Sequence, residues 1–458
     1  MTATIIESPD RPRTFFGEPS ALAYLAFTEA WERFSYYGMT ALLTLYMTKA
    51  LLLPGHVEHV AGFAALRGVL RGLFGVATPL AMASQIFGLY TALVYFTPLL
   101  GGLIADRWIG RRNAVAAGAV LMSAGHFAMA FDGSFLLALA FLILGCGLLK
   151  GNIAAQVGQL YPATDDSGRT RGFAIFSTGI NCGAVAGPLV CGLLAQIWGW
   201  HAGFGAAGVL MLIGLATYLI GYPHLKAASA RHAPEPTPEG GGRRRGEARI
   251  VLALTAVAAI TVFQSIAYYQ GANIGLIWID RQVDPRLLGF TIPTAWYNSV
   301  DSLVSILFVP VLFGLWRWQA RGGAEPNDLG KIAIGALICM AGNLVLATAS
   351  LGGGGLSPLW PVAALVLQGI AFLFYWPTLL ALVSRAAPPR LKSTLMGAAY
   401  LSLFAANTII GRLGGLYETM PPTAFWLLHA AIAAAGAALA LTVGRPLKRI
   451  LDAAAAES

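Results

Sequence analysis

The chain has 458 residues, of which 57% are hydrophobic and only 11% are charged, with a formal net charge of +9. A soluble domain carries about 25% charged residues, so this composition excludes a soluble enzyme, a nucleic-acid-binding module and a disordered scaffold. The mean hydropathy of +0.67 and many apolar stretches longer than about 18 residues predict a polytopic, all-α membrane protein.

Twelve apolar segments are predicted to span the bilayer, in two groups of six. The stretch 223–248, rich in Pro, Gly and Arg, separates the two groups and is typical of a flexible linker. The predicted organisation is therefore a tail (1–20), a six-helix bundle (21–222), a linker (223–248), a second six-helix bundle (249–444) and a second tail (445–458). The spans are expected near 21–49, 84–105, 112–131, 135–158, 172–197, 202–222, 249–279, 293–316, 331–351, 358–384, 393–416 and 423–444.

The Lys and Arg residues predict the orientation of the chain. About 22 of the 30 fall in segments on the same side as the N-terminus, and about five fall on the other side. Both termini are thus predicted to be cytoplasmic, in a plasma membrane that for a bacterium is the inner membrane. The outer segment 50–83 is long and semi-apolar, and we expect it to form a helical hairpin or to extend the first two spans.

Five charged side chains stand out within the predicted spans: Glu29, Glu32 and Arg33 in the first, Lys150 in the fourth and Asp301 in the eighth, whereas Arg412 in the eleventh span and Asp106 at the inner end of the second are marginal in depth. A charge at the centre of the bilayer costs about 2.5–3.5 kcal/mol on insertion scales, so such residues are functional candidates. Helical spacing places Glu29 next to both Glu32 and Arg33. The five charges sum to −1, which one proton would neutralise. This pattern favours a proton-coupled switch, whereas the structural alternative is a set of static ion pairs that fix helix packing.

Other motifs are absent from the sequence. It has no phosphate-binding GxxxxGK[ST] loop, no HExxH and no nucleophile elbow, so neither an ATP-driven mechanism nor an enzyme is predicted. Neither a metal nor a cofactor is expected. The four cysteines, Cys146, Cys182, Cys191 and Cys339, lie in apolar stretches and are interpreted as small buried residues.

Four motifs carry a resemblance to a known family. They are the first-span run from Glu29 to Gly38 (EAWERFSYYG), GGLIADRWIGRR at 101–112, LLKGNIAAQVGQLY at 148–161 and GFAIFSTGINCGA at 172–184. The first resembles the ExxERFxYYG signature of the proton-dependent oligopeptide transporter family of the major facilitator superfamily. The resemblance implies two pseudo-symmetric six-helix bundles around a central cavity, and import of di- and tripeptides by alternating access, driven by proton influx.

The resemblance also implies roles for individual residues. The residues that it implies in proton coupling are Glu29, Glu32, Arg33 and Lys150. The residues that it implies in substrate binding are Tyr37, Tyr95 and Asn181 in the N-terminal half and, at the corresponding binding positions of the C-terminal half, Tyr269, Gln270, Asp301 and Phe372. The residues that it implies in the inner gate are Asp106, Arg107 and Arg111.

Several positions differ from the family pattern in whether they carry a charged residue. Thr40 stands where the family often has arginine. Tyr269 and Phe372 stand where it has acids, and Asp301 stands where it usually has asparagine. Our hypothesis is that Asp301 contacts a substrate cation or holds a proton, and the alternative is a structural, hydrogen-bonded Asp.

The sequence thus predicts a monomeric, proton-coupled symporter of di- or tripeptides or similar zwitterionic solutes. The loss of the acid at Phe372 leaves open a non-peptide substrate, such as a modified amino acid or an organic anion. A passive channel or a transporter-like sensor is a further alternative.

Overall fold

A computed structural model describes residues 14–75, 78–162, 165–231, 247–287, 289–388 and 391–456. Most of the predicted N-terminal tail and the centre of the predicted linker, residues 232–246, lie outside these ranges. The described chain is almost entirely helical. Two short antiparallel hairpins accompany the helices: β1 (Thr14–Phe15) with β2 (Glu18–Pro19), and β3 (Arg286–Leu287) with β4 (Phe290–Thr291).

The N-terminal half contains six long helices and several short ones. The long helices are α1 (Ala21–Tyr46), α3 (Pro79–Ile104), α4 (Arg111–Ala128), α5 (Phe135–Gly158), α6 (Asp166–Trp198) and α7 (Trp200–Arg231). The short elements are η1 (Met47–Leu51), η2 (Val57–His59), α2 (Phe63–Phe74), η3 (Ala105–Ile109) and η4 (Asp132–Ser134).

The C-terminal half repeats this plan. Its first span is broken into α8 (Glu247–Gln270), the π-helical η5 (Gly271–Gly275) and α9 (Leu276–Gln282). The remaining elements are η6 (Thr294–Ser299), α10 (Val300–Arg321), α11 (Asp328–Ala349), η7 (Ser350–Gly352), α12 (Leu359–Ala386), α13 (Lys392–Gly414), η9 (Gly415–Glu418) and α14 (Pro422–Ala456).

Local sequence sets several helix starts. Thr78 caps α3 by accepting the Ala81 N–H, and Pro79 follows it at the first helical position. Asp165 caps α6 through the Gly168 N–H at 2.8 Å, and Asn327 caps α11 through the Gly330 N–H at 2.9 Å. Each cap satisfies an N–H that the helix itself leaves without a partner.

Among the described residues, ten helices or joined helical segments are long and apolar enough to cross a membrane. The two other long helices are α1, which carries Glu29, Glu32 and Arg33, and α4, which begins with Arg111 and Arg112. Their charges lower their hydropathy, while their length and packing match those of the other ten. Together they make the twelve expected spans.

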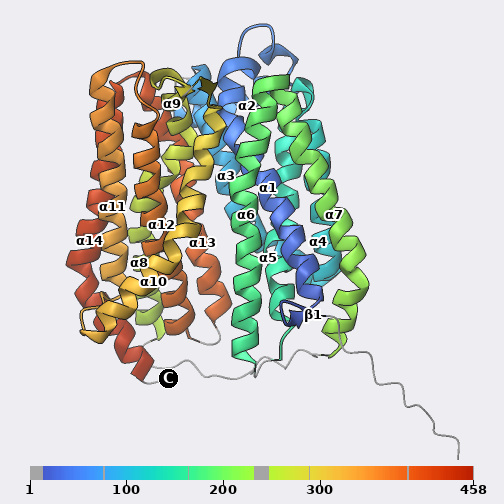
Figure 1. Ribbon diagram of the computed structural model, residues 1–458, viewed down its shortest axis with the longest axis vertical. Helices are drawn as coiled ribbons and strands as arrows, with labels where there is room; N and C mark the ends of the chain where they lie inside the picture. The colour runs from blue at the N-terminus through green and yellow to red at the C-terminus, as the bar shows by residue number, and fades with distance from the viewer. Residues whose placement is uncertain are drawn as a thin grey trace, which may run out of the picture.

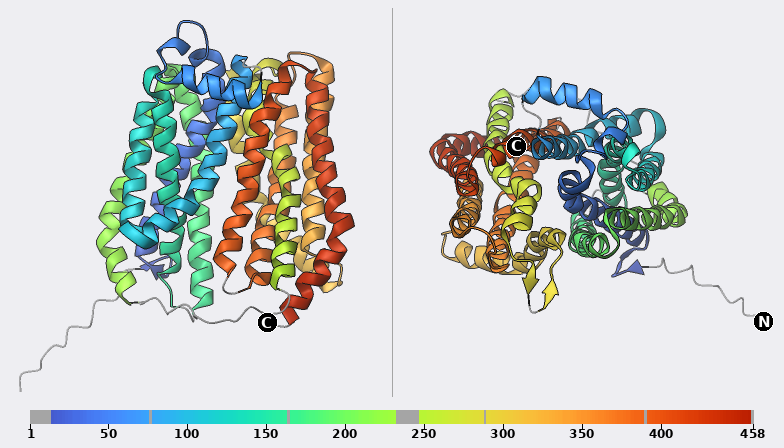
Figure 2. Two further views of the ribbon diagram at one scale, coloured as in Figure 1. Left: turned by 180° about the vertical axis from the view of Figure 1, so that it is seen from behind. Right: turned by 90° about the horizontal axis from the view of Figure 1, so that it is seen from above.

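The helices pack as two bundles that stand side by side (Figures 1 and 2). Within the first bundle α1 packs on α6 and α7, and α4 packs on α5. Within the second, α11 packs on α12 and α14, and α8 packs on α13 and α14. The bundles meet along α3 and α13 and along α6 with η6 and α10. We call the end with α2 the α2 end, and the end with β1, β2 and the last turns of α14 the termini end (Figure 1).

Three expectations need correction. Helix α7 continues through Pro223 to Arg231, so the start of the predicted linker is helical. Segment 50–83 forms neither a hairpin nor a simple extension of the first two spans, because α2 is a separate helix that lies across the others (Figure 2). Cys182 is exposed, whereas the other three cysteines are buried. Its neighbour Asn181 faces the space between the bundles, and one helical residue turns Cys182 by about 100° away from it.

Candidate functional site

A cavity of about 450 Å³ lies between the two bundles. Its wall comes from α1, α3, α5 and α6 on one side and from α8, η5, η6, α10, α12 and α13 on the other. None of the described lining residues belongs to α4, α7, α11 or α14, which pack on the outside. The predicted residues on the wall are Glu29, Arg33, Tyr37, Tyr95, Lys150, Asn181, Tyr269, Asp301 and Phe372.

The charged cluster on α1 forms as the helical spacing predicts. The Arg33 Nε lies 3.1 Å from Glu29 Oε1, one helical turn away, and also pairs with Glu32 Oε2. All three residues are at most 3% exposed. Glu29 Oε2 and Glu32 Oε1 accept no hydrogen bond from the described residues. The arginine thus neutralises one acid at most, and two buried carboxylate oxygens are left unsatisfied, an arrangement that favours proton binding.

Lys150 comes to the same cavity from α5. Its Nζ lies 4.6 Å above the centre of the Tyr95 ring, a cation–π contact. It forms no ion pair within the part of the chain that the structure describes. A half-buried ammonium that contacts an aromatic face and has no ion-pair partner among the described residues can bind an incoming carboxylate.

Asp301 lies on the opposite wall, in the first turn of α10. Its Oδ2 accepts a hydrogen bond from the Tyr268 hydroxyl at 2.6 Å, and its Oδ1 accepts one from the Ser302 N–H at 2.6 Å. The Phe372 ring stacks on Tyr268 with centroids 5.4 Å apart. Helix α12 can approach α10 this closely because it has a glycine there: a Cβ on Gly369 would lie 2.7 Å from the Asp301 carbonyl oxygen.

The predicted aromatic residues lie on both walls of the cavity. The hydroxyls of Tyr95 and Tyr269 lie 3.2 Å apart and join the two bundles across the cavity. Tyr37 packs edge-on against Tyr36. Gln270 is fully buried and is not among the lining residues, and its side-chain amide has no partner in the described chain.

Contacts between the bundles concentrate toward the α2 end. Lys49 in η1 pairs with Asp280 in α9 at 2.6 Å. Asn273 donates to Ser84 Oγ at 2.7 Å, and Ser84 donates to the Gly411 carbonyl oxygen at 3.0 Å. Backbones also touch here, because a Cβ on Gly88 would lie 2.6 Å from the Asn407 carbonyl oxygen. These contacts close the cavity toward the α2 end.

The predicted gate residues lie together at the termini end. Asp106 and Arg107 are in η3, a π-helical turn that follows α3, and Arg111 begins α4. The Arg111 Nε donates to Asp106 Oδ1 at 3.0 Å across an exposed surface. The pair lies within one bundle, so in this conformation it holds a turn in place and does not bridge the bundles.

Sequence reasoning did not assign a role to Tyr268, the hydroxyl donor to Asp301. The signal that could have found it is its position directly before Tyr269 in a span that also carries polar residues. Further cavity-lining residues that it passed over are Thr91, Asn298, Gln368, Tyr400 and Asn407. Among the described residues, no group of three or more His, Cys, Asp or Glu side chains could hold a metal ion.

Comparisons with known proteins agree with this architecture. The family model of the Major Facilitator Superfamily matches residues 25–411. A peptide transporter of Yersinia enterocolitica is 30% identical, with 96% of each chain covered. A di-/tripeptide transporter of Lactococcus lactis is 26% identical over 96% of this chain and 98% of its own. Among solved structures, a variant of the peptide transporter POT in complex with alafosfalin has a TM-score of 0.83 and 27% identity, over 96% of this chain and 97% of that one.

Proposed function

This chain belongs to the major facilitator superfamily and, within it, to the proton-dependent oligopeptide transporter family, and on that basis we propose that it imports di- and tripeptides together with protons. The relatives named for peptide transport are similar over nearly their whole length, which supports the substrate class. The observation that carries the proposal is the cavity between the bundles, which has on one wall a lysine that forms no ion pair with the described residues and on the other wall an aspartate.

The two walls suit a zwitterion. Lys150 belongs to the N-terminal bundle and binds the carboxylate of the peptide. Asp301 belongs to the C-terminal bundle and binds the ammonium group, with Tyr268 fixing the carboxylate by a hydrogen bond. A substrate that bridges the bundles in this way draws them together, as alternating access requires. The aromatic groups of Tyr37, Tyr95 and Tyr269 cover the mixed polar and apolar surface between the charged ends.

The α1 cluster couples the proton. Arg33 has two acids to neutralise, and Lys150, which lines the same cavity, is the candidate for the second positive charge. When the substrate carboxylate occupies Lys150, one acid of Glu29 and Glu32 lacks a counter-charge and takes up a proton. One charge crossing 100 mV releases about 2.3 kcal/mol. At about 1.4 kcal/mol per tenfold, this sustains a gradient of roughly 50-fold.

The orientation follows from Lys and Arg, which concentrate at the termini end. That end therefore faces the cytoplasm of a plasma membrane, the bacterial inner membrane. The contacts of Lys49, Ser84 and Gly88 close the outer side, so this conformation faces inward. Residues 21–222 and 249–444 act as the two rocking bundles of a monomer, and the turn with Asp106, Arg107 and Arg111 forms part of the inner gate.

The non-peptide alternative rests on Phe372, where the family has an acid. It is less well supported because Asp301 supplies a carboxylate to the same cavity and its partner Tyr268 stacks directly on Phe372. Asp301 can therefore bind the substrate cation in place of the acid that the family has at the position of Phe372.

The test is uptake of labelled dialanine into proteoliposomes that contain the purified full chain, with an acidic outside and a negative interior. We expect accumulation against a gradient that a protonophore abolishes and that unlabelled tripeptide inhibits. If dialanine entered only down its own gradient and the protonophore did not change its uptake, the proton coupling would be refuted. Accumulation inhibited by organic anions or amino acids but not by peptides would refute the peptide substrate.

A further inference from the structure

Helix α2 is set apart from the transmembrane helices. It lies across the outer ends of its neighbours on the flank of the molecule, nearly perpendicular to the spans (Figure 2). Glycines with left-handed backbone angles stand at both of its ends, Gly62 with φ of 79° and Gly75 with φ of 88°. Since L side chains rarely adopt such angles, these glycines let the chain turn sharply into and out of the helix.

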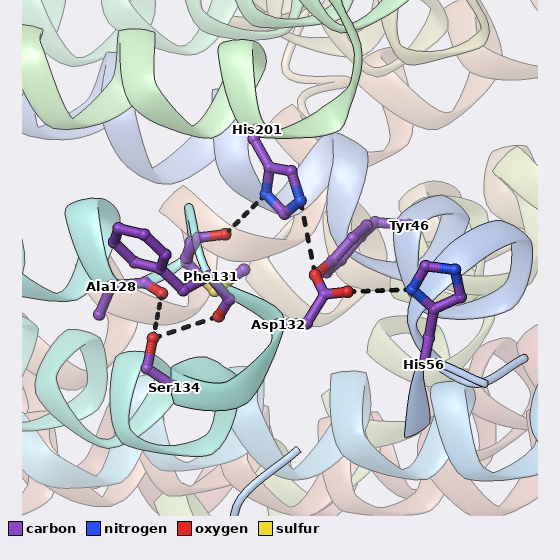
Figure 3. Close-up of polar contacts among 8 residues, drawn as sticks. Tyr46, His56, Ala128, Phe131, Asp132, Ser134 and His201 are labelled. Atoms are coloured by element: carbon purple, nitrogen blue, oxygen red, sulfur yellow. Dashed lines mark hydrogen bonds and ion pairs between the residues drawn. The ribbon is translucent and has the colours of Figure 1, made fainter. Parts of the chain in front are cut away.

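The segment that leads into α2 is fixed to the bundle. Figure 3 shows Asp132, in the turn before α5, accepting from the Tyr46 hydroxyl at 2.5 Å and facing His56 Nδ1 at 3.2 Å and His201 Nε2 at 3.4 Å. The Ala61 N–H also donates to the Gly133 carbonyl oxygen at 3.0 Å. His56 and Ala61 tie the loop to the turn before α5, and Asp132 ties that turn to α1 and α7, so the position of α2 at the edge of the bundle is defined.

One edge of α2 packs against the protein. Phe63 is 3% exposed and Leu70 is 1% exposed, and both belong to the core of the N-terminal bundle. At about 100° per residue, Leu70 lies about 20° from Phe63 around the helix. This inner edge faces the bundle and fixes how the helix is rotated.

The two edges beside it differ in chemistry. On one side Val69 and Leu73 lie at about 240° and 280° from Phe63, and they are 56% and 63% exposed. On the other side Arg67 and Arg71 lie at about 40° and 80°. Both arginines are exposed and form no ion pair with any residue that the structure describes. A helix lying flat with its inner edge against the bundle turns one of these edges toward the bilayer and the other toward water.

We propose that α2 is a membrane-interface helix, with Val69 and Leu73 inserted at the acyl-chain boundary of the outer leaflet and Arg67 and Arg71 at the level of the phospholipid phosphates. Moving exposed aliphatic side chains from water into the acyl region lowers the free energy, while the arginines stay charged in the headgroup layer. Apolar side chains on one edge and basic side chains on the other are typical of interfacial helices. Lipid is the partner that the position favours, because α2 lies on the flank of the bundle (Figure 2) and none of its residues is among the described residues that line the cavity. The helix then anchors the α1–α3 connection to the bilayer.

The test places a polarity-sensitive fluorophore on single cysteines of the full chain in proteoliposomes. Cys182→Ser removes the exposed native thiol and leaves the three buried ones. The matched pair is Leu73→Cys and Ala64→Cys, because both side chains are exposed and lie about 180° apart around α2. We expect the label at 73 to emit at shorter wavelength and to be quenched by doxyl-labelled lipid, and the label at 64 to be quenched by aqueous iodide. Equal iodide quenching at both positions would overturn the proposal.

Two further experiments distinguish contact with lipid from contact with another protein chain. Lowering the protein-to-lipid ratio tenfold leaves a lipid contact unchanged, whereas loss of the wavelength shift at 73 would mean that a second copy of the chain covers this edge. In vesicles of phosphatidylcholine with phosphatidylglycerol, we expect a larger shift at 73 than in phosphatidylcholine alone. The pair Arg67→Gln with Arg71→Gln should remove that difference, and its persistence would contradict the phosphate contact.

Discussion

Asp301→Asn tests whether the relocated acid binds the ammonium group of the substrate. The substitution keeps the size of the side chain and its ability to accept from Tyr268, but it removes the charge from a buried cavity wall. A hydrogen bond to a charged group contributes about 1.5–3 kcal/mol. At about 1.4 kcal/mol per tenfold, we expect affinity for a free dipeptide to fall about 10- to 100-fold.

The assay compares two competitors of uptake, dialanine and N-acetyl-dialanine, which lacks the ammonium group. In the unmodified chain dialanine competes better, and in Asp301→Asn we expect this preference to disappear while competition by the acetylated peptide changes little. Asp284→Asn, an exposed acid near β3, is the matched control and should behave like the unmodified chain. An equal loss for both peptides would refute the ammonium contact and leave Asp301 a structural residue.

Three further predictions concern coupling and closure. Glu32→Gln removes one of the two acids that Arg33 pairs with, so we expect proton-driven accumulation to be lost while substrate counterflow persists; accumulation that survives would contradict the coupling role. Gly88→Ala places a methyl group against Asn407 and Gly411, so we expect the outer side to stay open, with a cysteine at 407 labelled from outside by an impermeant thiol reagent. Lys49→Asp and Asp280→Lys should each slow uptake by up to about fivefold, because a half-exposed ion pair contributes about 0.2–1 kcal/mol, and the double variant should recover the rate if the pair acts as a closing contact.

The sequence predicted the helical architecture well because hydropathy and charge determine it directly. The span predicted at 135–158 coincides with α5, and the α1 cluster follows from a spacing of three and four residues. Helix ends beyond the bilayer were predicted poorly, as for α7, because there the helix is stabilised by propensity and packing and not by hydropathy.

The site was predicted as a set of residues but not as an arrangement. Lys150 and Asp301 are far apart in the chain, and only tertiary packing shows that they face one cavity from opposite bundles. Tyr268 received no individual role from the sequence because a tyrosine in a span is common. Its role as a hydrogen-bond donor depends on a carboxylate that another helix supplies. Helix α2 has strong amphipathicity in the sequence, but its orientation across the spans depends on the two flanking glycines and on contacts with the α4–α5 turn.

The charges of the cavity also link the substrate carboxylate to the proton. Glu29 and Glu32 carry −2, and Arg33 and Lys150 carry +2, so this group is neutral until the substrate carboxylate pairs with Lys150. The α1 cluster is then left with −1, and a buried uncompensated carboxylate is costly enough that it binds one proton.

A C-terminally amidated dipeptide therefore tests the coupling from the substrate side. It keeps the ammonium group for Asp301 but offers no carboxylate to Lys150, so the α1 cluster keeps both counter-charges. We expect the amide to compete weakly with dialanine and, when labelled, to carry no protons into the vesicle, as measured with an internal pH dye. Because the amide is itself a cation, this assay uses a pH gradient without a membrane potential, and under that gradient we expect the amide to enter without accumulation. An amide that accumulates with the same proton flux as dialanine would show that the proton is bound independently of the lysine. In that case the coupling would have to act through Arg33 and the α1 acids alone.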